Sequence, residues 1–337
     1  MGKGGSIILF QYGGALRGRA GTFSALPIGR TENMETDKGV VIMKKKNSRF
    51  RGGIFTSYWA PYAMLIPAMS AFIVFSIWPF ARNFYLSVYV TDMLGNPGTF
   101  VGLQNFKRVL QSEDFWISMK ATFKFGAAIG VGSFALSMAM ALLCINISKG
   151  SKVYQTMFAL PMAIASAPIS AIFTFIFNRY GLLNELLGTE IIWMNDVNWT
   201  IWVVAFISVW GGSSGGFLYL LVGFRNVPDE LVEAATLDGA TFWKKVRSIY
   251  IPIASPQIFF VVFLNIIGSL KAFGFIKQLV GTGPGKTTNV LIYAMYEYAF
   301  TRGRFETACV YAIMLFLVIF MVTRIQLICE KRLVHYQ

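Results

Sequence analysis

Charged side chains are scarce in this chain of 337 residues. Lys, Arg, Asp and Glu make up 14% of it, against about 25% of an average soluble domain. Hydrophobic residues make up 55%, and the 31 Phe, 15 Met and 8 Trp would leave large apolar patches on a surface that met only water. The composition therefore excludes an ordinary water-soluble domain and favours a protein that has lipid around part of its surface.

Cysteine and histidine are also rare. The three cysteines, Cys144, Cys309 and Cys329, stand far apart and form no CxxC pair, so a zinc site or a disulfide framework has almost no support. The single histidine, His335, offers nothing for His-based catalysis or a His-rich metal site. We expect no metal, cofactor or catalytic residue in this chain, and an integral membrane enzyme ranks last among its possible functions.

Six stretches without Asp, Glu, Lys or Arg approach the roughly 20 apolar residues that a helix needs to cross the hydrocarbon core. We predict transmembrane helices over about 58–81, 125–148, 153–178, 197–224, 248–270 and 305–326. The sequence thus predicts an all-α integral membrane protein with six transmembrane helices, in which residues 58–337 form one transmembrane domain.

The distribution of Lys and Arg predicts the orientation of these helices. The N-terminal segment, the second and fourth loops and the C-terminal segment hold 19 of the 30 basic residues, and the other three loops hold 11. Because the side richer in basic residues faces the cytoplasm, we expect both termini to be cytoplasmic in a multi-pass protein of the cell membrane.

Residues 1–57 differ from the rest because they are rich in Gly, Lys and Arg and include the cluster Lys44 to Lys46. We interpret them as a cytoplasmic basic tail whose end orients the first helix. A regulatory arm that touches anionic lipid is an alternative. A chain that starts at Met34 or Met43 is another.

The six uncharged stretches contain no carboxylate or basic side chain, and Glu306 lies at a span boundary, whereas proton-coupled carriers and pumps place such a group within their spans. Energy for transport must therefore come from passive flow or from a partner. The segment Gly281 to Thr287 looks like a phosphate-binding loop, but Val280 stands where that loop requires its first Gly. We expect a turn-rich external loop instead.

Small residues from Gly211 to Gly216 lie in the middle of the fourth stretch. They suit close packing of helices in lipid, and they also suit a broken or hinged helix that lines a cargo pathway. We take four residues as candidates for the substrate path, namely Gly212, Ser213, Asn265 and Lys271.

The fifth loop carries more basic residues than an external loop should. They are Lys271, Lys277, Lys286, Arg302 and Arg304, and Glu297 is the acidic residue among them. One explanation is a positive funnel that concentrates an anionic solute. Binding to acidic groups of a partner protein or to lipid headgroups explains them equally well.

The fourth loop, residues 225–247, holds four basic and four acidic residues and is interpreted as two short helices. Pro228, Asp229 and Glu230 begin the first, with the acidic side chains at its positive end. Gly239 interrupts the loop, and the second helix leads into the next span through Pro252. The residues alone leave two interpretations open, a docking surface for a partner or a solvated linker.

This loop resembles the EAA signature of permease subunits of binding-protein-dependent ABC importers. The signature is carried by Glu233-Ala234-Ala235, by Gly239 and by the run Ile249 to Pro252, with Ile251 where Leu is usual. In that family the loop is the coupling helix that lodges in a cleft of the cytoplasmic ATPase. The resemblance therefore implies that Glu233, Ala234, Ala235, Asp238, Gly239 and Pro252 couple this chain to an ATPase.

Further motifs resemble the carbohydrate-uptake branch of the family, which includes the maltose permease. They are the segments 100–106, 160–161, 180–184 and 283–300, while 150–156 and 334–337 are similar to the glycerol-3-phosphate permease subunit. The chain departs from many sugar permeases at Gly274, where an acidic residue often follows Phe.

The resemblance implies a type I ABC importer permease fold and a set of partners. These are a second, related permease, two ATPase subunits that bind ATP and magnesium, and an extracytoplasmic solute-binding protein. The cargo would be a sugar, an oligosaccharide or a polyol phosphate, and nucleic acid is not expected as a partner. The alternative function is an ATP-independent channel or facilitator for small polar solutes, although such a protein has no use for a compact docking loop.

Overall fold

The computed structural model describes residues 36–37, 40–41, 60–146 and 150–333. The chain divides into two units, 1–66 and 67–337, with the boundary inside the first helix. Among its described residues, the first unit contains β1 (Thr36–Asp37), paired antiparallel with β2 (Val40–Val41), and the start of α1 (Ala60–Phe72). The basic tail predicted for residues 1–57 lies almost entirely outside the described residues.

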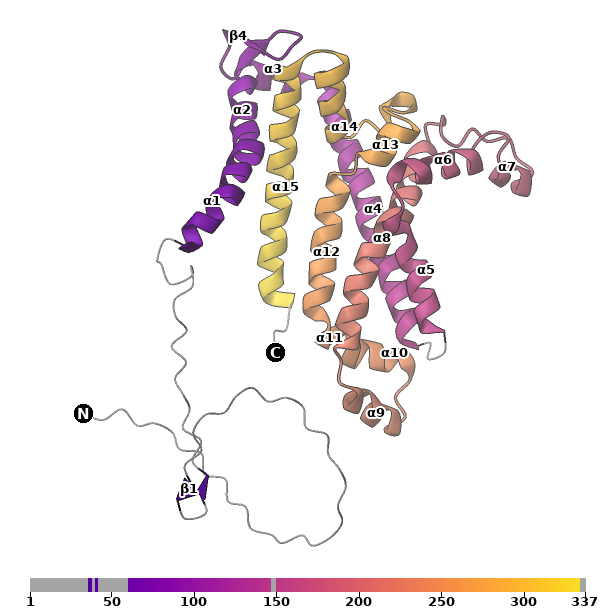
Figure 1. Ribbon diagram of the computed structural model, residues 1–337. Helices are drawn as coiled ribbons and strands as arrows, with labels where there is room; N and C mark the ends of the chain where they lie inside the picture. Colours follow the sequence, from indigo (N-terminus) through magenta and orange to yellow (C-terminus); the bar gives the residue numbers. More distant parts are fainter. Residues whose placement is uncertain (1–35, 38–39, 42–59, 147–149, 334–337) are drawn as a thin grey trace. The chain divides into compact units, whose positions relative to one another are not determined.

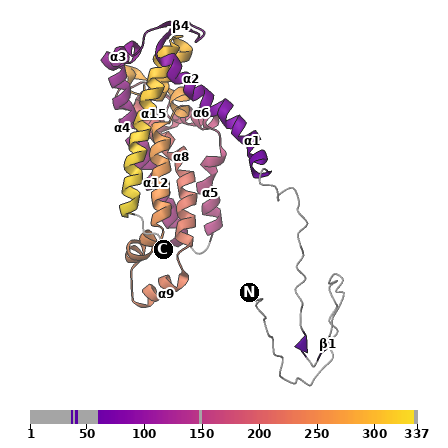
Figure 2. The same cartoon turned by 90° about the vertical axis from the view of Figure 1, so that its left-hand side faces the viewer.

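The second unit is helical except for a short hairpin (Figures 1 and 2). Its first half comprises η2 (Ile73–Ile77), α2 (Trp78–Ser87), β3 (Tyr89–Thr91), β4 (Pro97–Phe100), α3 (Gln104–Gln111), α4 (Glu113–Asn146), α5 (Ser151–Ala163), α6 (Ser166–Ile176) and α7 (Leu182–Leu187). Its second half comprises α8 (Thr200–Arg225), α9 (Asp229–Leu237), α10 (Phe242–Lys245), η3 (Val246–Tyr250), α11 (Ile251–Ile253), α12 (Ser255–Leu270), α13 (Gly274–Leu279), η4 (Pro284–Lys286), α14 (Leu291–Tyr296), η5 (Glu297–Thr301) and α15 (Phe305–Leu333).

Five helical segments of the described chain are long and apolar enough to cross a membrane. They cover Tyr62–Ser87, Glu113–Ile145, Thr200–Arg225, Ser255–Leu279 and Phe305–Lys331. Each contains most of one predicted span, so the prediction of a multi-pass all-α membrane protein is confirmed.

The predicted span 153–178 is not one straight helix. It consists of α5 and α6, which meet at an angle of 99°. Ile164 and Ala165 between them have extended backbone conformations. Pro168 explains the break, because it has no N–H for the carbonyl of Ile164 and its ring would clash with that carbonyl in a continuous helix. The two helices count as a sixth span only if the bent pair crosses the membrane as a unit.

The loops of the second unit gather at two opposite ends. Figure 1 places α9, α10, the start of α5 and the end of α15 at one end, and β4, α13, α14 and α7 at the other. This is the alternation that the Lys and Arg count predicts for the loops.

The core of the second unit lies between α4, α8 and α12. Phe217, Leu220 and Phe224 of α8 are fully buried against Ala141 of α4 and Val261 of α12. Near the other end of the same helices, Phe125 and Val204 pack with Ile276 and Val290. Dispersion and close fit hold such helices together in lipid, since lipid tails are as apolar as the side chains.

Asn184 organises the loop between α6 and α8. Its amide nitrogen donates to the carbonyl oxygens of Arg179 and Ile191, at 2.9 and 2.8 Å, and its amide oxygen accepts from Trp193 Nε1 at 2.8 Å. Gly181 is also required, because a Cβ there would lie 2.3 Å from the carbonyl oxygen of Phe175. The segment 180–184, noted in the sequence as a family motif, thus has a structural role.

Candidate functional site

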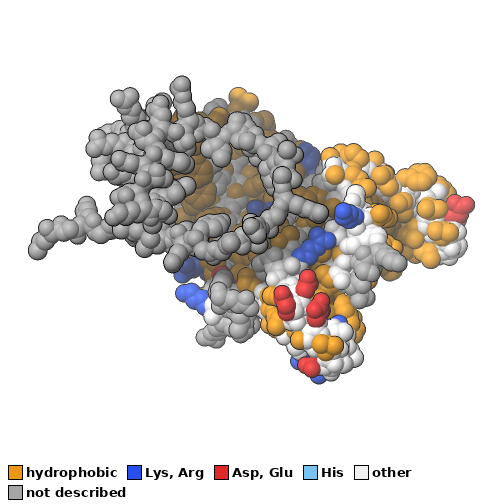
Figure 3. Space-filling model, turned by 60° about the horizontal axis from the view of Figure 1, so that its bottom comes forward, with side chains coloured by type: hydrophobic (Ala, Val, Ile, Leu, Met, Phe, Trp, Pro, Cys, Tyr) orange, Lys and Arg blue, Asp and Glu red, His pale blue; other side chains and the backbone are white. Residues whose placement is uncertain are grey.

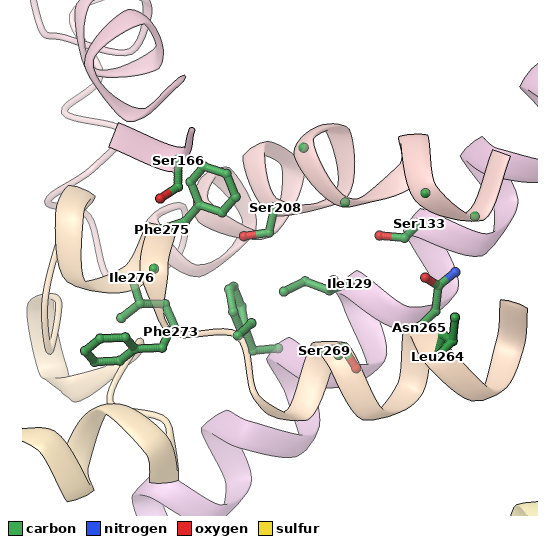
Figure 4. Close-up of a pocket in the computed structure, with 18 of the residues that line it drawn as sticks. Ile129, Ser133, Ser166, Ser208, Leu264, Asn265, Ser269, Phe273, Phe275 and Ile276 are labelled. Carbon is green, nitrogen blue, oxygen red and sulfur yellow. The ribbon is translucent and has the colours of Figure 1, made fainter. Parts of the chain in front are cut away.

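A cavity of about 460 Å³ lies between α4, α8, α12 and α13, with Ser166 of α6 at its side (Figure 4). Small-molecule sites in proteins have similar volumes, about 300–1,000 Å³. Figure 4 shows Ser133 and Asn265 at one end of the cavity and Phe273 and Ile276 at the other. The lining residues, all within the described chain, include no Lys, Arg, Asp, Glu or His. The cavity is therefore apolar with a few neutral polar groups.

Hydroxyl and amide groups supply the polarity of this cavity. Ser208 Oγ donates to the carbonyl of Val204 at 2.7 Å, and Ser269 Oγ donates to that of Ile266 at 2.9 Å. Both oxygens keep lone pairs with which to accept a hydrogen bond. Ser133 Oγ and Asn265 Nδ2 are buried and have no hydrogen-bond partner among the described residues. Because a buried polar group without a partner is costly, these two atoms suit a hydroxylated solute.

The glycines of α8 divide into two kinds. An added Cβ at Gly215 would meet nothing within 4 Å, and the same holds for Gly268 of α12 across the cavity. A Cβ at Gly216 would instead lie 2.7 Å from Ser137 Oγ of α4 and 3.0 Å from Val261. The run therefore serves both helix packing and the lining of the cavity. The helix α8 is continuous across it, so it is not broken there.

Two of the four predicted substrate-path residues line the cavity. Gly212 and Asn265 do so. Ser213 is fully buried, donates to the carbonyl of Trp210, and accepts at its own carbonyl a 2.6 Å hydrogen bond from Ser137 Oγ, so it joins α8 to α4. Lys271 is exposed at the end of α12 and is not among the lining residues.

The loop after α8 forms a projection at the α9 end of the molecule. Across Asp229–Leu237 no side chain is buried, and Leu237 and Trp243 are 89% and 69% exposed. Figure 3, which views this end, shows acidic side chains beside apolar ones on it. The two short helices predicted for the loop are confirmed, with α9 starting at Asp229.

Gly239 fixes the end of α9. Its φ is +74°, its N–H donates to the carbonyl of Thr236, and the N–H of Ala240 donates to that of Ala235. These two bonds form a Schellman motif, which requires a left-handed residue after the helix. Glu233, Ala234, Ala235 and Asp238 thus lie on one short helix whose end Gly239 determines.

Pro252 lies apart from that group, in the connection to α12. The turn before it, η3, is π-helical, and Ala254 after it leaves helical geometry before α12 begins. Pro252 cannot donate to the carbonyl of Ser248, which accounts for a distorted turn there. The projection consequently joins the end of α8 to the start of α12, and both of these helices line the cavity.

The basic residues of the fifth loop are mostly paired with carboxylates. Lys286 bonds to Asp114, Arg302 to Glu297 at 2.7 Å, and Arg304 to Glu306 at 3.4 Å. The hydrogen bond to Asp114 raises the pKa of Lys286. Lys271 and Lys277 have no carboxylate partner among the described residues, so three of the five charges proposed for a funnel are neutralised.

The segment that resembles a phosphate-binding loop forms a tight turn. Gly283 and Gly285 have φ of +66° and +59°, and the only helix within it is the three-residue η4. It follows α13 rather than a strand, and its lysine, Lys286, is paired with Asp114. The expectation of a turn-rich loop is confirmed.

The model of the family described as "Binding-protein-dependent transport system inner membrane component" matches residues 133–335 of the chain. The chain belongs to this family. It is thus the permease subunit of an ABC importer, as the EAA signature predicted. The loop with Glu233 and Gly239 and the cavity-lining parts of α8 and α12 all fall within the matched residues.

Relatives of this permease cover nearly the same length. The sn-glycerol-3-phosphate transport system permease protein UgpA of Agrobacterium fabrum is 29% identical over 84% of this chain and 98% of its own. That of Yersinia enterocolitica is 30% identical with the same coverage. A chain from a bacterial ABC transporter that imports the acidic polysaccharide alginate has the same fold, with a TM-score of 0.74, 21% identity, and coverage of 82% of this chain and 96% of its own.

Sequence reasoning missed several cavity residues of the permease, above all Ser133, Gly268 and Phe273. One signal was available on α12, where Asn265, Gly268 and Ser269 recur at spacings of three and four, which place them on one helix face. No such pattern singles out Ser133 among the small residues of α4, because its importance depends on which helix faces it.

Proposed function

We propose that this permease carries a hydroxylated solute through the cavity between α4, α8 and α12, and that ATPase subunits drive it through the α9 projection. One observation carries the proposal. The exposed projection is the covalent link between α8 and α12, the two helices that supply most of the cavity lining. A force applied to α9 is therefore transmitted directly to both walls of the cavity.

The chemistry of the projection suits a protein partner. A helix that exposes Leu231 and Leu237 beside four carboxylates is poorly stable alone, since nine residues make a marginal helix in water. Docking against an apolar cleft with a basic rim would cover the apolar side chains and pair the acidic ones. In this proposal two ATPase subunits provide such clefts, and they, not this chain, bind ATP and magnesium.

The cavity supports a sugar, an oligosaccharide or a polyol phosphate as cargo. Its polar atoms belong to uncharged hydroxyl and amide groups, which match hydroxyl groups on a solute. The names of the relatives point the same way, since one group transports sn-glycerol 3-phosphate and another protein imports alginate. The cavity itself offers no fixed charge, so an anionic group of the cargo must be held elsewhere in the assembly.

The proposed assembly contains a second, related permease and an extracytoplasmic solute-binding protein. In one solved structure the alginate ABC transporter is in complex with an alginate pentasaccharide-bound periplasmic protein, and a chain of that structure has the fold of this one, with a TM-score of 0.73 and 21% identity. With the α9 end in the cytoplasm, both termini would lie inside, and the hairpin end would meet the solute-binding protein.

Uptake by the reconstituted complex tests this proposal. The solute that copurifies with the binding protein is identified first and then supplied to vesicles with and without internal ATP. Glu233→Arg should abolish ATP-driven uptake while the subunit still inserts, because it reverses an exposed charge on α9. Glu185→Arg, on α7 at the other end of the molecule, is the matched control and should transport normally. ATP-independent uptake by the wild type would instead establish the facilitator.

The cavity is tested separately by filling it. Gly215→Leu places a side chain where the structure has open space, so assembly should survive while uptake falls. Gly216→Leu forces a side chain against Ser137 and Val261 and should destabilise the permease, since overpacking costs about 1–3 kcal/mol. Normal uptake by Gly215→Leu would show that the solute passes elsewhere.

A further inference from the structure

An aromatic cluster lies where the cavity meets the fifth loop. We define it as Phe273, Tyr293, Tyr296 and Phe300. The ring centroids of Phe273 and Tyr296 are 5.2 Å apart, and those of Tyr296 and Phe300 are 5.3 Å apart. Phe273 also lines the cavity, whereas Phe300 is 72% exposed. The cluster therefore runs from the surface of the molecule to the cavity wall.

The rings of the cluster are inclined to one another. The planes of Phe273 and Tyr296 are inclined by 57°, and those of Tyr296 and Phe300 by 39°. Tyr293 and Tyr296 are both partly exposed. Because the rings are inclined and partly exposed, part of their surface is open to a ligand, and the negative face of an aromatic ring attracts the C–H groups of a sugar ring as well as cations.

Among the described residues, the ammonium group of Lys277 sits over this cluster. Lys277 Nζ lies 4.3 Å from the ring centroid of Tyr296 and 5.7 Å from that of Phe273, both within cation–π range. The neighbouring carboxylate of Glu297 accepts hydrogen bonds from two guanidinium nitrogens of Arg302. Lys277 is exposed and has no carboxylate partner among the described residues, whereas Lys286, Arg302 and Arg304 are all paired.

From this arrangement we infer that Lys277 and the aromatic cluster form an outer subsite for one anionic sugar ring, which stacks on Tyr296 and Phe273 and pairs its carboxylate or phosphate with Lys277. The inference rests on the proposed transport function and adds to it a position for the charge that the cavity cannot hold. In place of a funnel of five basic residues, the inference has one lysine. Its ammonium group lies against two rings and has no carboxylate partner among the described residues, so it can bind an anionic ligand. Lys is suited to this because its ammonium binds as a point charge without a fixed geometry.

The subsite is tested by binding to the complete importer in nanodiscs, without the solute-binding protein, using saturation-transfer NMR. The probes are glucuronate, glucose 6-phosphate and glucose, which share a pyranose ring and differ in charge. The two anions should bind wild type about two- to fivefold more tightly than glucose, the range of an exposed ion pair. Whether carboxylate or phosphate binds better distinguishes the two sources of charge.

The variants separate ring and charge. Lys277→Met should bring the affinities for all three probes to about the same value and leave glucose binding unchanged. Tyr296→Leu should weaken all three, and Tyr296→Phe, which keeps the ring, should bind like wild type. Lys107→Met, an exposed lysine on α3, is the control and should keep the preference for anions.

Two outcomes would overturn the subsite. One is a preference for anions that survives in Lys277→Met, and the other is wild-type binding by Tyr296→Leu, as expected of rings that only anchor the protein at the membrane interface. Uptake measured on the same variants shows whether the subsite or the proposed transport function has failed. Lost anion selectivity with ATP-dependent uptake supports the subsite, whereas uptake that never depends on ATP refutes the importer instead.

Discussion

Replacement of Gly239 by Ala tests how strongly coupling depends on the end of α9. The φ of +74° is in the left-handed region, and an added Cβ would meet nothing within 4 Å. The substitution therefore changes only the backbone energy, by roughly 1–2 kcal/mol for a residue other than glycine. A helix of nine residues is marginal without its cap. The cost therefore lowers the fraction of molecules in which α9 ends correctly at Gly239.

A cost of one to two kcal/mol corresponds to a factor of about 5–30 in such a population. ATP-driven uptake by Gly239→Ala in proteoliposomes should fall by up to this factor, while insertion into the membrane is unchanged. Uptake by Gly239→Asn should fall less than uptake by Gly239→Ala, because Asn tolerates the left-handed conformation better than Ala does. Uptake and ATP hydrolysis measured on the same vesicles would show whether the two activities separate.

Gly188 provides a matched control for this experiment. It follows α7 with a φ of +63°, and an added Cβ there would also meet nothing within 4 Å. Gly188→Ala has the same backbone cost at the opposite end of the molecule, so uptake should stay near wild type. The reasoning is refuted if Gly239→Ala transports normally, or if Gly188→Ala loses as much activity as Gly239→Ala.

Two further predictions concern the loops. Asn184→Ala removes the partner of the buried Trp193 Nε1 and of two carbonyl groups, so it should lower the stability of the complex by about 1–3 kcal/mol. Thermal unfolding in detergent checks this, and an unchanged midpoint would contradict it. Tyr180 and Leu237 are 84% and 89% exposed. A single cysteine at position 180 should react with an impermeant thiol reagent only from outside, and one at position 237 only from inside. Labelling in the reverse order would overturn the orientation with both termini inside.

The sequence by itself determines that the protein resides in a membrane and how many apolar segments it has. The reason is that lipid imposes a length of about 20 apolar residues on each span, a constraint that can be counted along the chain. The α9 projection is equally local, because Glu233, Gly239 and the two short helices lie within one stretch whose capping depends on neighbouring residues. The break between α5 and α6 was also accessible in principle, since Pro168 disfavours a continuous helix there.

Only the tertiary structure decides which residues line the cavity and which merely pack. Ser213 and Gly212 are adjacent in the sequence, yet Ser213 is buried against α4 while Gly212 faces the cavity. Gly215 and Gly216 both line the cavity, yet an added Cβ would meet nothing within 4 Å at Gly215 and would meet Ser137 at Gly216. Each helix position turns by about 100° around the axis, and the neighbour on each side depends on how the helices assemble. Likewise, the charges of the fifth loop could be counted, but their pairing joins Lys286 to Asp114, 172 residues away in the chain. Contacts of that kind follow from the packing of whole helices, which no local pattern specifies.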